Sequence, residues 1–177
     1  MSDDYATRVE AIHRALGIPS DYATSRNLPL QPEAPAGDLR AVGLNPKNRE
    51  MTLVAPAAAA WEKLPRAAIA DRIALLPWSG FRSLARQEEI IRRKLATGQP
   101  LSGILQWVAA PGYSEHHGGR AIDLGTPGDP PLEESFATTL AFDWLTLRAG
   151  QFGFILSYPK DNRHGITYEP WHWCWRR

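Results

Sequence analysis

Apolar residues recur at helical spacing in several parts of the chain. A stripe from Tyr5 to Leu16 predicts a first helix, which Gly17 ends. The segment AAAAWEKL predicts a second helix, interrupted or restarted at Pro65. The proline-rich stretch between them has no clear period, which predicts an extended arm rather than a separate domain.

Two further helices are predicted downstream. Ser83 can cap the helix LARQEEIIRRKLATG, in which Leu84, Ile91 and Leu95 share one face. Residues 132–149 predict a strong helix that Gly150 closes. The apolar stripe expected on this last helix comprises Phe136, Leu140, Trp144 beside Asp143, and Leu147.

Four short apolar runs predict strands: IALLPWSG as a buried strand before a glycine turn, then RAIDL, FGFILSYP and ITYEPWHWCW. Helices and strands do not alternate regularly, and no internal repeat is present. The pattern therefore predicts an α+β fold with a small antiparallel sheet flanked by helices.

The length of 177 residues suits a single globular domain. Within it, residues 1–50 are expected to form the N-terminal helix and arm, packed on a core of residues 51–177. Hydrophobic residues make up 44% and charged residues 22%, and the formal net charge is +1. This balance indicates neither a nucleic-acid partner nor an anionic membrane surface.

Cys174 is the single cysteine, which excludes an internal disulfide and a multi-cysteine zinc site. The N-terminus MSDDYATRVEAIHRALG lacks the basic region and apolar segment of a secretory signal. No apolar run approaches the ~20 residues of a membrane span. We therefore expect a cytoplasmic protein, or a periplasmic one if the sequence is a piece of a longer chain.

The stretch YSEHHGGRAIDL has the composition of a metal site. If RAIDL is a strand, Ala121 and Asp123 share one face, and the small Ala121 leaves room beside the carboxylate. Gly118 and Gly119 allow a sharp turn that brings His116 back toward Asp123. An imidazole and a carboxylate are two of the three protein ligands that a catalytic zinc requires.

The segment EPWH offers the third ligand, His172. Pro170 disfavours a helix at Glu169, so Glu169 is expected to end an extended segment before a turn that carries His172. A carboxylate beside a metal, but not bound to it, can act as a general base. Each feature alone has a plainer interpretation: the His-His pair as a surface loop, Asp123 as a turn cap or ion-pair partner, and WHWCW as an aromatic core strand. Together they favour a metal site.

These residues resemble a known family, the zinc D-alanyl-D-alanine carboxypeptidases of the VanX/VanY type. The pattern Ser114-x-His116-x-x-Gly119-x-Ala121-x-Asp123 resembles the first motif of that family, and YEPWH resembles the second. SGFRSLARQ and FGFILSYP also resemble VanY-type segments. The resemblance covers roughly residues 50–177 and implies a zinc cleft on the sheet, as in hedgehog and D-Ala-D-Ala peptidase folds.

The resemblance implies a role for each matching residue. His116, Asp123 and His172 would bind one zinc ion, and Glu169 would be the catalytic base. Arg82 would stabilise the developing oxyanion or hold the substrate carbonyl. The residues expected to contact substrate are Ser114, Gln87 and Trp171.

The implied function is removal of a terminal D-alanine from peptidoglycan stem peptides, with L,D or D,D specificity, in muropeptide recycling or precursor trimming. Two alternatives stay open, a zinc endopeptidase that cuts within stem peptides and a non-catalytic binding module. The chain departs from the family where SEHQTG usually stands, because His117 and Gly118 replace two residues. His117 is expected to line the cleft without binding metal. Ser157 replaces an arginine that is frequent at this position of the family. Of the other histidines, His164 is expected to be exposed and His13 to lie on the polar side of its helix.

Overall fold

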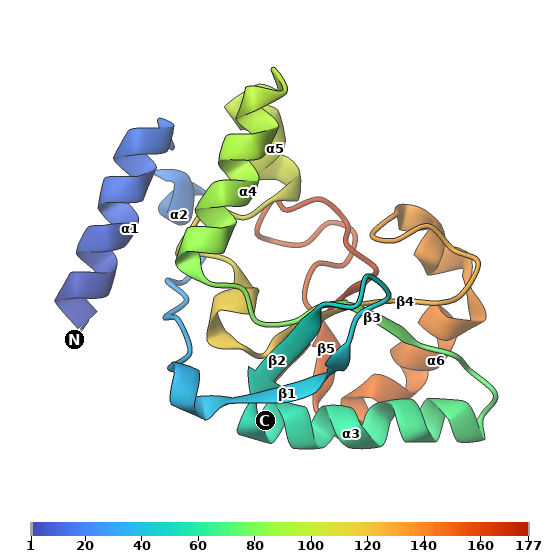
Figure 1. Cartoon of the computed structure of the whole chain (residues 1–177). Helices are drawn as coiled ribbons and strands as arrows, with labels where there is room; N and C mark the ends of the chain where they lie inside the picture. The colour runs from blue at the N-terminus through green and yellow to red at the C-terminus, as the bar shows by residue number, and fades with distance from the viewer. Residues whose placement is uncertain (1, 177) are drawn as a thin grey trace.

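The computed structural model describes residues 2–176 and arranges helices around a small antiparallel sheet, which confirms the predicted α+β class (Figure 1). The main elements in chain order are α1 (Ser2–Leu16), α2 (Tyr22–Ser25), β1 (Leu39–Leu44), β2 (Glu50–Val54), α3 (Ala55–Ala70), β3 (Leu76–Ser79), α4 (Leu84–Ala96), α5 (Leu101–Trp107), β4 (Ala121–Gly125), α6 (Leu140–Arg148), β5 (Phe154–Leu156) and β6 (His172–Trp175). Four short 3₁₀ helices join them: η1 (Ala36–Asp38), η2 (Glu115–Gly118), η3 (Glu134–Thr138) and η4 (Ala149–Phe152).

The main sheet has the strand order β3-β4-β6-β5, and every neighbouring pair is antiparallel. β4 and β6 are its central strands, so each has a partner on both sides. β1 and β2 form a separate two-stranded hairpin that leads directly into α3. All five residues of β4 are buried, as expected for a strand enclosed on both faces.

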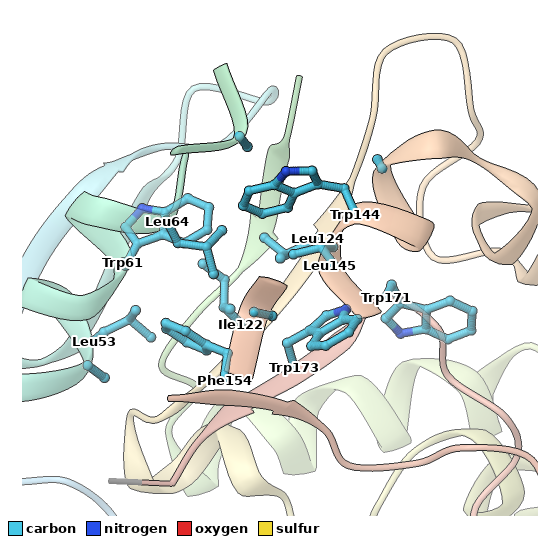
Figure 2. Close-up of a cluster of buried hydrophobic side chains, with 14 of the residues drawn as sticks. Leu53, Trp61, Leu64, Ile122, Leu124, Trp144, Leu145, Phe154, Trp171 and Trp173 are labelled. Atoms are coloured by element: carbon cyan, nitrogen blue, oxygen red, sulfur yellow. The ribbon is translucent and has the colours of Figure 1, made fainter. Parts of the chain in front are cut away.

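The main hydrophobic core lies between the sheet and helices α3 and α6 (Figure 2). Ile122 and Leu124 project from β4 into this core, since they share one face of the strand. The same alternation turns Ala121 and Asp123 to the opposite face. The larger members of the core are Leu53, Trp61, Leu64, Phe136, Trp144, Leu145, Phe154, Trp171 and Trp173.

A second core joins the N-terminal helices to α4 and α5. The arm that follows α2 is held to the rest of the protein by main-chain hydrogen bonds: Gln31 donates to the Gly112 carbonyl and Ala34 to the His117 carbonyl. The β1–β2 hairpin contains residues from both sides of position 50. The division of the chain into an arm of residues 1–50 and a core therefore stays a prediction.

The helix expected to break at Pro65 is continuous, so that prediction was wrong. α3 runs from Ala55 to Ala70 with Pro65 inside it. A proline removes one helical hydrogen bond, but burial of Trp61, Leu64 and Ala68 against the core stabilises the helix on both sides of it.

The single helix expected over residues 132–149 is also wrong, because the segment divides at Thr139. Thr139 is extended, and its hydroxyl accepts a hydrogen bond from the Phe142 amide, which caps α6. A new helix begins after this cap, so the residues on either side of Thr139 do not share one continuous helical face. Leu140 and Leu147 are therefore 76% and 79% exposed instead of buried.

The strand predicted for the segment IALLPWSG is shorter and less buried than expected. β3 covers only Leu76–Ser79, and its residues are half-buried. β5 is limited to three residues, and the final strand begins only at His172. Among the described residues, no helix is long and apolar enough to cross a bilayer.

Candidate metal centre and active-site cleft

Three buried side chains converge on the face of the sheet opposite the main hydrophobic core. One ligand atom each from His116, Asp123 and His172 lies within 4.8 Å of the others. His116 Nε2 is 3.2 Å from Asp123 Oδ2, and His172 Nδ1 is 3.1 Å from Asp123 Oδ1. The structure thus brings together the three residues expected as metal ligands.

The fold positions these residues through local features of the backbone. Asp123 on β4 lies directly opposite His172 on β6 in the antiparallel register. Gly119 adopts a left-handed conformation at the end of η2, and the chain turns there so that His116 comes back over β4. The His172 amide donates to the Glu169 carbonyl across the turn predicted at Pro170.

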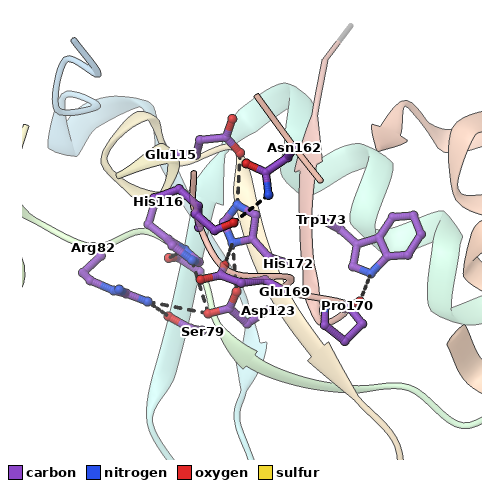
Figure 3. Close-up of polar contacts among 12 residues, drawn as sticks. Ser79, Arg82, Glu115, His116, Asp123, Asn162, Glu169, Pro170, His172 and Trp173 are labelled. Atoms are coloured by element: carbon purple, nitrogen blue, oxygen red, sulfur yellow. Dashed lines mark hydrogen bonds and ion pairs between the residues drawn. The ribbon is translucent and has the colours of Figure 1, made fainter. Parts of the chain in front are cut away.

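Outer hydrogen bonds orient both imidazole rings. His116 Nδ1 donates to the Gly80 carbonyl at 2.7 Å, which leaves the Nε2 lone pair facing Asp123. His172 Nε2 donates to Glu115 Oε2 at 3.0 Å and turns Nδ1 toward Asp123 (Figure 3). Gly80 itself lies so close to β2 that a Cβ there would be 2.7 Å from the Thr52 carbonyl oxygen, which only glycine avoids.

The three donors fit a tetrahedral zinc. Ligands ~2.0–2.2 Å from a zinc ion lie roughly 3.3–3.6 Å apart at tetrahedral angles. The two histidine nitrogens lie 3.2 and 3.1 Å from different oxygens of Asp123, and one donor atom from each of the three residues lies within 4.8 Å of the others. Two imidazoles and one carboxylate leave one coordination position for water or substrate, which is typical of a catalytic site. The paired acceptors Gly80 and Glu115 fix the tautomers that a metal requires.

Glu169 lies beside this group. Its Oε2 is 3.8 Å from His172 Nδ1, and the residue is 9% exposed. Burial raises the pKa of the Glu169 carboxyl to about 7, with His172 acting against that rise and Asp123 adding to it. A carboxyl group whose pKa is near neutrality can both accept and return a proton.

The pKa values of His172 and of the two carboxylates beside it differ from those of exposed groups. Burial alone would lower the His172 pKa, but hydrogen bonds to Asp123 and Glu115 raise it to about 10 in the metal-free protein. Burial alone would raise the Glu115 pKa, but His172 outweighs it and lowers the pKa to about 2. Burial opposes ionisation of Asp123 as well, yet His116 and His172 keep its pKa well below the usual range.

Arg82 enters the site from the loop after β3. Its guanidinium is 3.6 Å from Asp123 Oδ2 and donates to Ser79 Oγ at 3.1 Å and to Gln87 Oε1 at 3.0 Å. Gln87 is 1% exposed, and its amide nitrogen donates to the Ala109 carbonyl. Both polar atoms of the Gln87 side chain are therefore engaged in holding Arg82 and the α5–η2 connection.

These groups line one cleft of about 760 Å³. Ser114 and Trp171, which were expected to contact substrate, both face it, and Trp171 also packs in the main core. Trp107 stands at the cleft wall with 51% of its surface exposed. The roles of Ser114, Gln87 and Trp171 toward a substrate stay predictions.

His117 does not face the cleft, contrary to expectation. It is fully buried, its Nδ1 donates to the Arg82 carbonyl at 2.6 Å, and its Nε2 accepts from the Gly112 amide. Burial lowers its pKa to about 4, so the ring is neutral at pH 7. His117 thus supports the backbone that carries Arg82.

The other histidines and the cysteine lie outside the metal group. His13 is half-buried and its Nε2 donates to the Pro111 carbonyl, so the expectation that it lies on the polar side of α1 was wrong. His164 is half-buried rather than exposed, and its Nδ1 lies 3.1 Å from the Arg26 carbonyl oxygen. Cys174 is buried in β6, and burial raises the pKa of its thiol above its ordinary value.

The sequence interpretation missed Glu115 and Arg176. Glu115 binds His172 from the side opposite Asp123, and the Arg176 guanidinium donates to the other Glu115 oxygen. The one available signal was a carboxylate directly before a predicted ligand histidine. Ser157, which replaces the frequent arginine, lies near this same carboxylate.

Comparisons with known proteins identify relatives of this chain. The sequence profile of the VanY family, described as D-alanyl-D-alanine carboxypeptidase, matches residues 50–177. A D-alanyl-D-alanine carboxypeptidase of Enterococcus faecalis is 33% identical over 117 residues, which are 60% of this chain and 42% of that protein. The chain thus spans less than half the length of that relative.

Solved structures share the fold. The structure of the LdcB LD-carboxypeptidase superposes with a TM-score of 0.71 at 30% identity, over 80% of this chain and 69% of that one. A mutant of the vancomycin-resistance D,D-pentapeptidase VanY in complex with Zn(II) gives a TM-score of 0.63 at 26% identity, over 85% and 87% of the two chains.

Proposed function

Because the chain belongs to the VanY family of D-alanyl-D-alanine carboxypeptidases, we propose that it is a zinc carboxypeptidase that removes a C-terminal D-alanine from peptidoglycan stem peptides. The observation that carries this proposal is the group formed by His116, Asp123 and His172, with Glu169 beside it. This arrangement offers three ligands, an open position and a buried base.

His116 Nε2, the Asp123 carboxylate and His172 Nδ1 would hold the ion. When bound, zinc would polarise the scissile carbonyl and lower the pKa of a water molecule in the open position. A purely structural site is disfavoured, since such sites have four protein ligands.

Glu169 would act as general base and then as general acid. Its carboxylate accepts the proton of the attacking water and passes it to the departing amine of D-alanine. The burial that raises its pKa to about 7 suits both steps, because the group then changes protonation state readily near neutral pH. Glu169 is a carboxylate before the reaction and a carboxylate again after it gives up the proton, so it is regenerated in each cycle.

Arg82 would stabilise the oxyanion that develops on the scissile carbonyl. Ser79 and Gln87 hold its guanidinium in place before substrate binds, which lowers the cost of reorganisation during the reaction. Ser114 and Trp171, which line the cleft beside the metal group, would contact the terminal D-alanine.

Two substrate classes fit this chemistry, tetrapeptides cut by an L,D-enzyme and pentapeptides cut by a D,D-enzyme. We favour trimming of tetrapeptides released during wall recycling, since a cytoplasmic D,D-activity would destroy precursors that wall synthesis needs. The cytoplasmic location itself stays a prediction, which fractionation of cells that express the complete gene would test.

The decisive experiment is mass spectrometry of two muropeptides incubated with zinc-loaded protein, one a pentapeptide ending in D-Ala-D-Ala and the other a tetrapeptide ending in one D-alanine. Loss of alanine from the tetrapeptide identifies an L,D-carboxypeptidase, and loss from the pentapeptide alone identifies a D,D-enzyme. Cleavage of internal or cross-linking bonds without alanine release would support an endopeptidase. If neither peptide is cut while zinc is bound, a binding module replaces this proposal.

A further inference from the structure

Glu115 contacts both His172 of the metal group and Arg176, which follows β6. Its Oε2 accepts from His172 Nε2 at 3.0 Å, and its Oε1 accepts from the Arg176 guanidinium. Figure 3 shows Glu115 and Asp123 on opposite sides of the His172 ring. The imidazole is therefore enclosed by two carboxylates, each opposite one ring nitrogen.

The backbone fixes where Arg176 lies. Its amide donates to the Gly153 carbonyl at 2.9 Å, and the amide of the preceding Trp175 donates to the Arg120 carbonyl at 3.0 Å. The Arg176 bond continues the hydrogen bonding between β5 and β6 one residue beyond the end of β6. Arg176 lines a second cavity, of about 600 Å³, that Glu115 and Arg120 also line.

The chemistry of imidazole explains what such a contact can do. A neutral imidazole carries its proton on either nitrogen, and only the unprotonated nitrogen can bind a metal. An acceptor at Nε2 keeps the proton there and leaves the Nδ1 lone pair for the metal. Glu115 can serve this purpose only while its oxygen stays at Nε2, and Arg176 holds the other oxygen of the same carboxylate.

We propose that Glu115 and Arg176 are positioning residues of the metal centre, in which Arg176 fixes Glu115 and Glu115 fixes the orientation and tautomer of His172. This inference rests on the proposal that His172 binds the metal. Arg176 does not line the active-site cleft, so its effect must pass through Glu115 and His172.

The test compares five proteins: wild type, Arg176→Gln, Arg176→Lys, Glu115→Gln and the control Arg120→Gln. Arg120 is an exposed guanidinium beside the same cavity that stacks over the Trp175 ring. Zinc affinity is measured by competition with a chelator, and the tautomer of His172 by nitrogen-15 NMR of the zinc-loaded protein. Thermal melting of the metal-free proteins reports any separate effect on folding.

We expect Arg176→Gln to weaken zinc binding roughly 10-fold or more, in the range found for outer contacts of metal ligands. Arg176→Lys restores much of the affinity, because its ammonium can still donate to Glu115, while Arg120→Gln leaves it unchanged. Glu115→Gln is expected to weaken zinc binding further, on the order of 10–100-fold.

Wild-type affinity and an unchanged His172 tautomer in Arg176→Gln would overturn the inference, and a lower melting temperature alone would show that Arg176 only anchors the chain end. In both cases the proposed zinc site would stand. Failure of the wild-type protein to bind one zinc ion would overturn the site and this inference together, so the two failures are distinguishable.

Discussion

Asp123 and His172, separated by 49 positions in the chain, lie directly opposite each other on neighbouring strands, and Asp123 Oδ1 is 3.1 Å from His172 Nδ1. Two of the three proposed ligands are thus set by the hydrogen bonding of the sheet itself. A site built on paired strands holds its geometry more tightly than a site on loops. Metal binding and the integrity of the β4–β6 pair should therefore depend on each other.

Replacement of Glu169 by glutamine should separate catalysis from metal binding. The amide introduced by Glu169→Gln cannot accept a proton from water, so we expect kcat/KM to fall by a factor on the order of 10²–10⁴. Zinc content, measured by mass spectrometry of the metal, should stay at one ion per chain. Loss of zinc together with activity would instead make Glu169 a ligand.

The pH profile of kcat/KM should show the ionisation of Glu169. Burial raises its pKa to about 7 in the metal-free protein, and the base is active only as the carboxylate. Activity should therefore rise as pH increases and level off above the pKa. A bound cation lowers the pKa of a nearby carboxyl, so the midpoint should lie at or below about 7. A profile without this acidic limb would argue against Glu169 as the base.

Substitution of Arg82 tests the proposed oxyanion contact. Arg82→Gln should reduce kcat roughly 10²–10³-fold, as loss of one oxyanion donor does elsewhere, with a smaller effect on KM. Arg82→Lys should recover only part of the activity, because an ammonium cannot reach Ser79, Gln87 and the substrate as a guanidinium fork does. The exposed Arg163 gives a matched control, and an equal loss in Arg163→Gln would indicate a general charge effect.

A single methyl group added at Gly80 should weaken the metal centre, although Gly80 is not one of the proposed ligands. The added Cβ would lie 2.7 Å from the Thr52 carbonyl oxygen, so the backbone must shift, and with it the carbonyl that orients His116. We expect Gly80→Ala to lower both the melting temperature and the zinc affinity.

The helical Gly103 is the control for this substitution, since a Cβ there meets only Pro100 at an ordinary distance of 3.6 Å. Gly103→Ala should leave zinc affinity unchanged and maintain or raise stability. Unaltered zinc binding in Gly80→Ala would contradict the role given to the Gly80 carbonyl.

Removal of zinc with a chelator should lower the melting temperature. Zinc at about 1,000 times its dissociation constant stabilises the folded chain by about 4 kcal/mol, which corresponds to roughly 8–16 °C for a protein of this size. Re-addition of zinc should restore the transition, whereas magnesium should not, because two imidazole ligands favour zinc. Differential scanning fluorimetry measures this directly, and identical melting with and without chelator would exclude a tightly held ion.

The sequence by itself predicted the class of fold and which three residues the proposed ligand set comprises. Residues in YSEHHGGRAIDL act through neighbours within a few positions, where strand alternation and a left-handed Gly119 dictate which side chains meet. The turn between Glu169 and His172 is equally local, because Pro170 restricts the residue before it. Such features can be inferred from sequence, since the energy terms that decide them lie within one turn or strand.

Tertiary structure decided the contacts that cross the chain. Sequence periodicity could not show that α6 restarts at Thr139 and so exposes Leu140, because one cap outweighed a long helical pattern. Nor could it show that His117 supports the backbone of Arg82, 35 positions away, or that Arg176 reaches Glu115 across 61. Adjacent side chains of η2 diverge, and their partners are brought to them only when the sheet, the loop after β3 and the chain end pack together.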